Sequence, residues 1–234
     1  MGRGVAACAL VCTVACGRIG FEPRTGSIDA ATAPVAWVGV FVAQGNNTSI
    51  ATDTFVAAAR NAGDAIAIHL YCTSNTAASG VAISAPGWTF DMVGPMTGSV
   101  ANTDWVASVG AIAPDTAMTT FTVAWAGTNH CQFMDELGDE FANVSGFGDH
   151  AETLGATGNC AATVTPSAST DTVWAACSGN LSAIEAGFTK GADDANNDWS
   201  EYRLTGAAAG SAEQVTFTSA GTSWVMTAMT IRAR

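Results

Sequence analysis

The word ANTDW, at residues 101–105, returns with a single change as ANNDW at residues 195–199. The surroundings of the two words also match, because a Gly-aromatic-Thr triplet precedes each and a Phe/Thr alternation follows each. Four blocks recur in one order, with spacings that shorten along the chain as loop deletions in the second copy would produce. The sequence therefore predicts two related halves, about 36–146 and 157–234, against the alternative of chance similarity in Ala-, Thr- and Ser-rich text.

The repeated blocks have the residue pattern of β-strands. In TTFTVAW (119–125), Phe121, Val123 and Trp125 alternate with small or polar residues, which is the period of a half-buried strand. Many short strands separated by Gly, Pro and Asn predict an all-β fold, an antiparallel jelly-roll β-sandwich. We expect the two halves to leave one open apolar face each and to close a single core together. Two independent domains are the alternative, although no linker separates the halves.

Short motifs stand in a fixed order along the chain. They are Gly63-Asp64 before an apolar strand, PGWT at 86–89, FTVAW at 121–125 and EFANVSG at 140–146. This order resembles that of exported bacterial two-repeat jelly-roll proteins of unknown function, over about residues 36–232. The chain departs from that pattern in its cysteines and at Ala142-Asn143, which interrupt an E-F-S-G-V-like strand. The resemblance implies an architecture shared by adhesin-like, carbohydrate-binding and structural modules, and it implies no catalytic residue.

The N-terminus has the pattern of a secretion signal. Arg3 precedes a short apolar run, Val5–Ala15, which is too short for a permanent membrane helix. Cys16 follows a small residue, as the lipidated cysteine does in a bacterial lipobox, although Thr13 stands where Leu or Val is usual. We therefore predict a signal peptide over residues 1–15 and a lipid anchor on Cys16. An ordinary signal peptide cleaved nearby is the alternative.

The anchor prediction sets the expected location of the protein. In lipoproteins, a residue other than Asp after the cysteine, here Gly17, implies passage to the outer membrane of a Gram-negative bacterium. We then predict the anchor cysteine and a flexible tether over residues 16–34, and the β-sandwich domain over residues 35–234. Without lipidation, the protein is expected to be secreted. Contact with the membrane is expected through the lipid anchor only.

The charge balance narrows the classes of partner. Twenty acidic residues against eight basic ones give a formal net charge of −12. A surface that tracks phosphates is therefore not expected, and neither is docking on anionic lipid. We expect no nucleic-acid role, and a polysaccharide or an envelope or extracellular protein as the partner.

Four cysteines beyond Cys16 predict two disulfides, with three pairings open. Cys160 and Cys177 flank two strand patterns at matching distances from a central turn, so we expect them to face each other across a hairpin. That leaves Cys72 with Cys131, which is the preferred set. No C-x-x-C or His–Cys spacing indicates zinc.

The segment MDELGDE holds Asp135, Glu136, Asp139 and Glu140. Two carboxylates across a cleft could hydrolyse a glycosidic bond, but neighbouring residues of a strand point to opposite faces. We therefore expect a solvated edge or rim here. No nucleophile elbow, H-E-x-x-H, phosphate loop or dinucleotide fingerprint occurs, and His69, inside an apolar strand, is expected to be a core or solvent-facing histidine.

Two further stretches suggest binding. In DDANNDWSE (193–201), Asp194, Asn196 and Asp198 alternate as hard oxygen ligands of Ca²⁺ could, but the spacing is not that of an EF-hand. An Asn/Asp-rich turn leading into a strand is the alternative reading, and no other cofactor is expected. Trp88, in PGWTF, is expected either to lie on a loop, where its ring gives a sugar a face to stack on, or to pack in the core.

These patterns together favour a non-enzymatic cell-envelope lipoprotein whose β-sandwich binds a polysaccharide or a protein. A secreted glycan-active hydrolase that uses residues 135–140 is the alternative from another class. A purely structural envelope component is the third reading.

Overall fold

The computed structural model describes residues 33–46, 50–74, 76–94, 97–98, 104–127, 131–206, 208–219, 221 and 223–234. The predicted signal peptide and Cys16 lie outside these residues. Thr32–Arg234 form one compact unit. The described residues contain strands and no helix, so none of them forms a helix long and apolar enough to cross a membrane.

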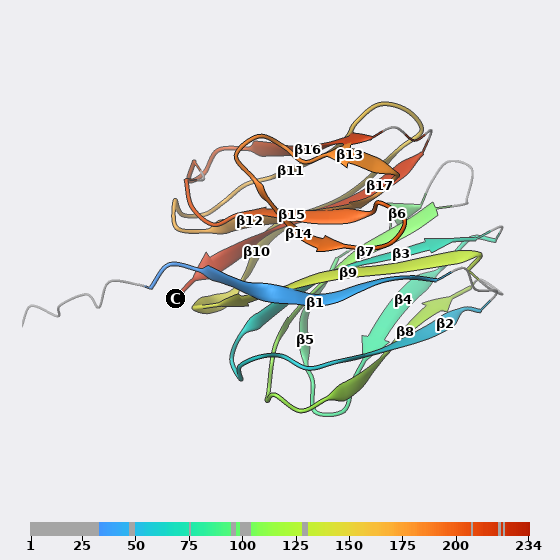
Figure 1. Ribbon diagram of the computed structural model, residues 1–234, viewed down its shortest axis with the longest axis horizontal. Helices are drawn as coiled ribbons and strands as arrows, with labels where there is room; N and C mark the ends of the chain where they lie inside the picture. Colours follow the sequence, from blue (N-terminus) through green and yellow to red (C-terminus); the bar gives the residue numbers. More distant parts are fainter. Residues whose placement is uncertain are drawn as a thin grey trace, which may run out of the picture. The chain divides into compact units, whose positions relative to one another are not determined.

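The first half of the described chain forms two antiparallel sheets (Figure 1). The first large sheet has, in spatial order, β1 (Ala36–Asn46), β9 (Phe133–Ala142), β3 (Ala65–Thr73), β7 (Asp104–Ile112) and β5 (Phe90–Val93), with β6 (Thr97–Gly98) also paired to β7. The first small sheet has β2 (Thr52–Ala57), β8 (Thr119–Ala126) and β4 (Gly80–Ser84).

The second half also forms a large and a small antiparallel sheet. The second large sheet has β10 (Val144–Gly155), β17 (Trp224–Ala233), β12 (Thr172–Ser178), β15 (Trp199–Arg203) and β14 (Thr189–Asp193). The second small sheet has β11 (Cys160–Val164), β16 (Glu213–Ser219) and β13 (Leu181–Ala183). The predicted all-β antiparallel sandwich class is confirmed.

The strand orders of the two halves can be compared directly. In chain order, β1, β3, β5, β7 and β9 hold the places in the first large sheet that β10, β12, β14, β15 and β17 hold in the second. The strands of the small sheets correspond in the same way. Descent of the halves from one duplicated unit stays a prediction, because strand order does not record ancestry.

Matching local geometry accompanies the matching order. Gly87 and Gly187 have φ of 80° and 90°, a conformation that glycine adopts without steric cost. The next residue in each case, Trp88 or Phe188, donates its backbone N–H to the carbonyl three residues earlier, at 3.2 Å. Both aromatic side chains are buried, so each turn places a large ring in a core.

Three apolar clusters hold the sheets together. Phe41, Phe55 and Phe121 belong to a core between the sheets of the first half, and Val173 and Phe217 belong to a core within the second half. A third core, which includes Phe141, Trp174 and Met229, joins the two large sheets. Figure 1 shows the small sheets on opposite sides of the large ones.

This arrangement corrects one expectation, that the halves close a single core together. Each half has a core of its own, because strands such as β2, β4, β11 and β13 cover one face of each large sheet. These strands are three to six residues long, so they give only a weak periodic signal in the sequence. The central strands of the large sheets, β3, β9, β12 and β17, are consequently buried on both faces.

Both predicted disulfides are present with the preferred pairing. Cys72 and Cys131 are joined with their Cα atoms 5.4 Å apart, and Cys160 and Cys177 with theirs 6.7 Å apart. The expected hairpin geometry is wrong for the second pair, because Cys160 lies on β11 and Cys177 on β12, which belong to different sheets. This bond therefore ties the small sheet to the large sheet of its half.

Candidate binding site between the two large sheets

The acidic segment lies at the centre of the molecule, which overturns the prediction of a solvated rim. β9 pairs with β1 on one side and β3 on the other, and Asp135, Glu136, Asp139 and Glu140 are each at most 1% exposed. Because side chains alternate along a strand, the two aspartates share a face with Leu137, which packs between the large sheets. The two glutamates point to the opposite face, toward the core of the first half.

Asp139 links three strands across the interface of the large sheets. Its carboxylate accepts hydrogen bonds from Trp37 Nε1 on β1 at 3.0 Å and from Trp174 Nε1 on β12 at 2.8 Å. It also accepts one from the hydroxyl of Ser200 on β15. Burial raises the pKa of Asp139, and these three bonds oppose the rise. The carboxylate is thus a buried structural connection between the halves.

The glutamates of β9 have a different role. Glu140 Oε1 accepts the backbone N–H groups of Arg60 at 2.7 Å and Asn61 at 3.3 Å, in the turn that precedes β3. Burial and the nearby charge of Asp53 raise the pKa of Glu136 to about 8. Neither glutamate is among the residues that line the cavity described below.

His69 on β3 is a fully buried histidine with partners on both ring nitrogens. Nδ1 lies 3.1 Å from Thr227 Oγ1, and Nε2 lies 3.1 Å from Ser178 Oγ. When Asp135 is ionised, the Ser178 hydroxyl donates its only hydrogen to Asp135 Oδ2, and Nε2 of His69 is then the ring nitrogen that donates to Ser178 Oγ. The prediction of a core histidine is confirmed over its solvent-facing alternative.

This histidine should make the protein sensitive to acid. Burial lowers the pKa of His69 from 6.5 to about 3, so between these values only the unfolded chain binds the proton, and stability falls as the pH falls. In His69→Gln, that loss should disappear. From pH 7 to pH 4, the stability of the wild type should fall by about 3 kcal/mol more than that of the variant, by urea denaturation. Parallel pH profiles for the two proteins would contradict this assignment.

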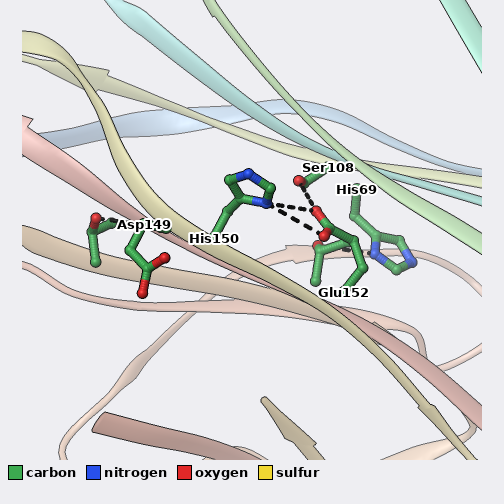
Figure 2. A network of polar contacts seen from close by, with 7 residues as sticks. His69, Ser108, Asp149, His150 and Glu152 are labelled. Atoms are coloured by element: carbon green, nitrogen blue, oxygen red, sulfur yellow. Dashed lines mark hydrogen bonds and ion pairs between the residues drawn. The ribbon is translucent and has the colours of Figure 1, made fainter. Parts of the chain in front are cut away.

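A second polar group lies at the same interface, where β10 faces β7. Figure 2 shows the Glu152 carboxylate pointing toward Ser108 and His150. Ser108 donates to Oε1, and His150 Nδ1 lies 3.2 Å from the same oxygen. Burial raises the pKa of Glu152, and the bonds to Ser108 and His150 oppose the rise. Glu152 is thus a further buried carboxylate with its partners in place.

The loop between β14 and β15 has the geometry of an Asn/Asp-rich turn, which was predicted as the alternative to a calcium site. Asp194 Oδ1 accepts the backbone N–H groups of Asn196 at 2.8 Å and Asp198 at 3.0 Å. Asp198 Oδ1 in turn accepts the backbone N–H of Gly179 at 2.7 Å. The turn therefore holds both carboxylates against the end of β12.

The structure adds a third carboxylate to this pair. One oxygen each of Asp135, Asp194 and Asp198 lies within 4.8 Å of the others, and all three residues are buried. Burial raises the pKa of Asp198 to about 7, and burial followed by the charge of Asp198 raises the pKa of Asp135 well above its usual value. We call these three residues the aspartate cluster. Asp135 was considered in the sequence only with its neighbours in the acidic segment.

A polar cavity of about 300 Å³ lies beside the aspartate cluster. It is lined by residues of both halves, which are Tyr71, Phe133, Ser178, Gly179, Asn180, Asn196, Asp198, Gly221 and Ser223. The rings of Tyr71 and Phe133 lie 5.9 Å apart and tilted at 55°. Two aromatic residues, two asparagines and two serines are thus among the residues that line one cavity. None of the lining residues stood out in the sequence except those of the β14–β15 loop.

Trp88, the residue predicted to offer a sugar-stacking face, does not do so. It is 9% exposed, and its ring packs against Phe121 at 4.9 Å and Phe41 at 5.9 Å. Both neighbours belong to the core of the first half, so the packing role is correct. Phe133 and Tyr71 are the aromatic residues that line the cavity instead.

Comparisons with protein-family models, with curated proteins and with solved structures found no match to this chain. The functional interpretation consequently rests on the residues themselves.

Proposed function

We propose that the protein is a non-catalytic binding module of the bacterial cell envelope that takes a polysaccharide segment in the cavity beside the aspartate cluster. The observation that supports this proposal is the lining of the cavity. Tyr71 and Phe133 supply ring faces for the apolar side of a sugar, while Asn180, Asn196 and Ser223 supply groups for its hydroxyls. Ligand sites commonly combine aromatic walls with a few polar groups in this way.

The charges around the cavity favour a neutral ligand over an anionic one. Among the described residues that line it, Asp198 is the only acidic or basic one, and the whole chain has a formal charge of −12. An anionic polymer would therefore meet repulsion. A protein that presents a polar, uncharged segment is the second class of partner. The retention assay on a panel of polysaccharides, described in the Discussion, distinguishes the two classes.

The hydrolase alternative would need two carboxylates at a cleft. Glu136 and Glu140 are buried and do not line the cavity, so the acidic segment does not supply such a pair. Only Asp135 of that segment lies near the cavity, and it is fully buried behind Ser178, to which it is hydrogen-bonded. This placement favours binding over hydrolysis.

We further propose that Cys16 is lipidated and anchors the protein to the outer membrane, with the sandwich outside the bilayer. A preceding small residue and an apolar run support this. In a Gram-negative host, the wild type should incorporate labelled palmitate and partition with membranes. The Cys16→Ala protein should do neither, and a Cys16→Ala protein that still labels would contradict the anchor.

The test of the proposed function is a retention assay with a matched pair of variants. Phe133→Leu removes an aromatic ring from the cavity wall, whereas Phe55→Leu makes the same change in the core of the first half. We expect Phe133→Leu to weaken retention on immobilised polysaccharide by up to about tenfold, because contacts to an aromatic ring contribute on the order of 0.5–1.5 kcal/mol beyond the burial of area. Phe55→Leu should bind as the wild type does. Equal retention by both variants would contradict the assignment of this cavity.

A further inference from the structure

The aspartate cluster joins the two halves of the molecule. Asp135 comes from β9 of the first large sheet, whereas Asp194 and Asp198 come from the loop that leads from β14 into β15 of the second. Their closest carboxylate oxygens all lie within 4.8 Å of one another. Three like charges so close together in a buried place repel each other strongly unless something neutralises them.

No basic side chain neutralises them within the described part of the chain. The ion pairs found there involve Glu152, Asp193 and Glu213, and none of them includes a member of the cluster. Backbone N–H groups satisfy part of Asp194 and Asp198, but they carry no full positive charge. The cluster is therefore short of positive charge.

Asp135 gives a second and independent indication of a missing partner. The residue is fully buried, and Oδ2 accepts a hydrogen bond from Ser178. Oδ1 is also buried, yet it has no hydrogen-bond partner among the described residues. A buried carboxylate oxygen without a partner costs free energy comparable to a lost charged hydrogen bond, so such atoms in folded proteins commonly bind an ion or water.

We propose that the aspartate cluster binds a calcium ion that links β9 to the β14–β15 loop. Ca²⁺ takes six to eight oxygen ligands at about 2.3–2.6 Å, so oxygens on opposite sides of one ion lie about 5 Å apart. The upper separation of 4.8 Å within the cluster is compatible with that distance. Carboxylates are the ligands that this hard cation prefers, and two of the three residues are those of the calcium reading of the loop.

The adjoining cavity can supply the remaining ligands. Asn180 and Asn196, whose amide oxygens are of the kind that calcium binds, are among its lining residues, and the cavity of about 300 Å³ has room for several waters beside the ion. The ion would lie at the side of the cavity that Asp198 forms. Calcium binding is thus expected to fix the loop that forms this wall. The proposal is independent of the proposed polysaccharide function, since no polysaccharide takes part in binding the ion.

The experiment is a calcium titration of the full chain, purified in mild detergent, after exhaustive dialysis against EDTA and then against metal-free buffer. Isothermal titration with CaCl₂, in the absence of any polysaccharide, should show one site. The midpoint of thermal unfolding should rise by about 3–6 °C at saturating CaCl₂. A wild-type protein with neither binding heat nor a shifted midpoint would overturn the proposal.

Two variants and a control assign the site. Asp198→Asn should raise the calcium dissociation constant at least tenfold. Asp135→Asn should do the same, and should also raise the midpoint of the calcium-free protein, because one of the repelling charges is gone. Asp193→Asn, at the end of β14 next to this loop but exposed and paired with Lys190, should respond to calcium as the wild type does. Wild-type calcium affinity in both cluster variants would overturn the assignment. If one variant does not fold, wild-type affinity in the other is enough to overturn it.

Discussion

Removal of both disulfides is expected to lower the free energy of unfolding by about 7 kcal/mol. The loop-entropy relation gives about 3 kcal/mol for Cys160–Cys177, whose partners are 17 residues apart, and about 4 kcal/mol for Cys72–Cys131, 59 residues apart. Domains are commonly stable by only about 5–15 kcal/mol, so the doubly reduced chain should be close to unfolding or unfolded at room temperature.

This expectation can be checked by urea denaturation of two Cys→Ala pairs and of the chain with all four alanines. Each pair should unfold at lower urea than the wild type, and the Cys72/Cys131 pair should lose more. A reducing agent should change the midpoint of the wild type but not that of the protein that lacks all four cysteines. A wild-type midpoint that is the same with and without reductant would contradict the structural role of both bonds.

Asp139→Ala is expected to destabilise the protein by about 3–5 kcal/mol. The substitution leaves the indole N–H groups of the half-buried Trp37 and the buried Trp174, and the hydroxyl of Ser200, without their acceptor. It also opens a cavity between the two large sheets. Asp139→Asn keeps one acceptor oxygen and should lose less.

Chemical denaturation followed by tryptophan fluorescence measures this effect, because two of the released partners are tryptophans. Asp193→Ala is the matched control, since it removes a carboxylate whose side chain is 49% exposed and should cost less than about 1 kcal/mol. If Asp139→Ala also lowered the free energy of unfolding by less than about 1 kcal/mol, the carboxylate would not hold the large sheets together.

The fold class was predictable because the strong strand signals are local. Phe121, Val123 and Trp125 alternate in β8 and are all buried, as the period of two requires. The apolar run of β12 is instead buried on both faces, since Val173 packs within its half and Trp174 packs between the large sheets. A continuous run shows only that a strand is buried, so the presence of a separate core in each half could not be read from it.

The buried acidic strand was not predictable for a physical reason. The donors that satisfy Asp139 lie 102, 35 and 61 residues away in the chain, and the partners of Glu140 lie about 80 residues away. A sequence pattern shows the charges of β9 but not the N–H and O–H groups that the fold brings to them. Without such partners, four carboxylates in six residues belong in water, which is why a rim was expected.

The candidate site was predictable only in its local part. Asp194, Asn196 and Asp198 form their turn within five residues, so their spacing in the sequence already indicated it. Asp135 and the aromatic pair of the cavity come from strands of the other half. Trp88 shows the opposite case, in which a conspicuous residue in a loop motif proved to be part of the core.

The most direct test of the proposed function is retention of the full chain on a panel of immobilised neutral polysaccharides, with an assay for newly formed reducing ends. We predict retention on at least one polymer without release of sugar, and competition by soluble fragments of that polymer. Release of sugar by the bound protein would show a hydrolase instead. No retention on any polymer would contradict carbohydrate binding and leave a protein partner as the occupant of the cavity.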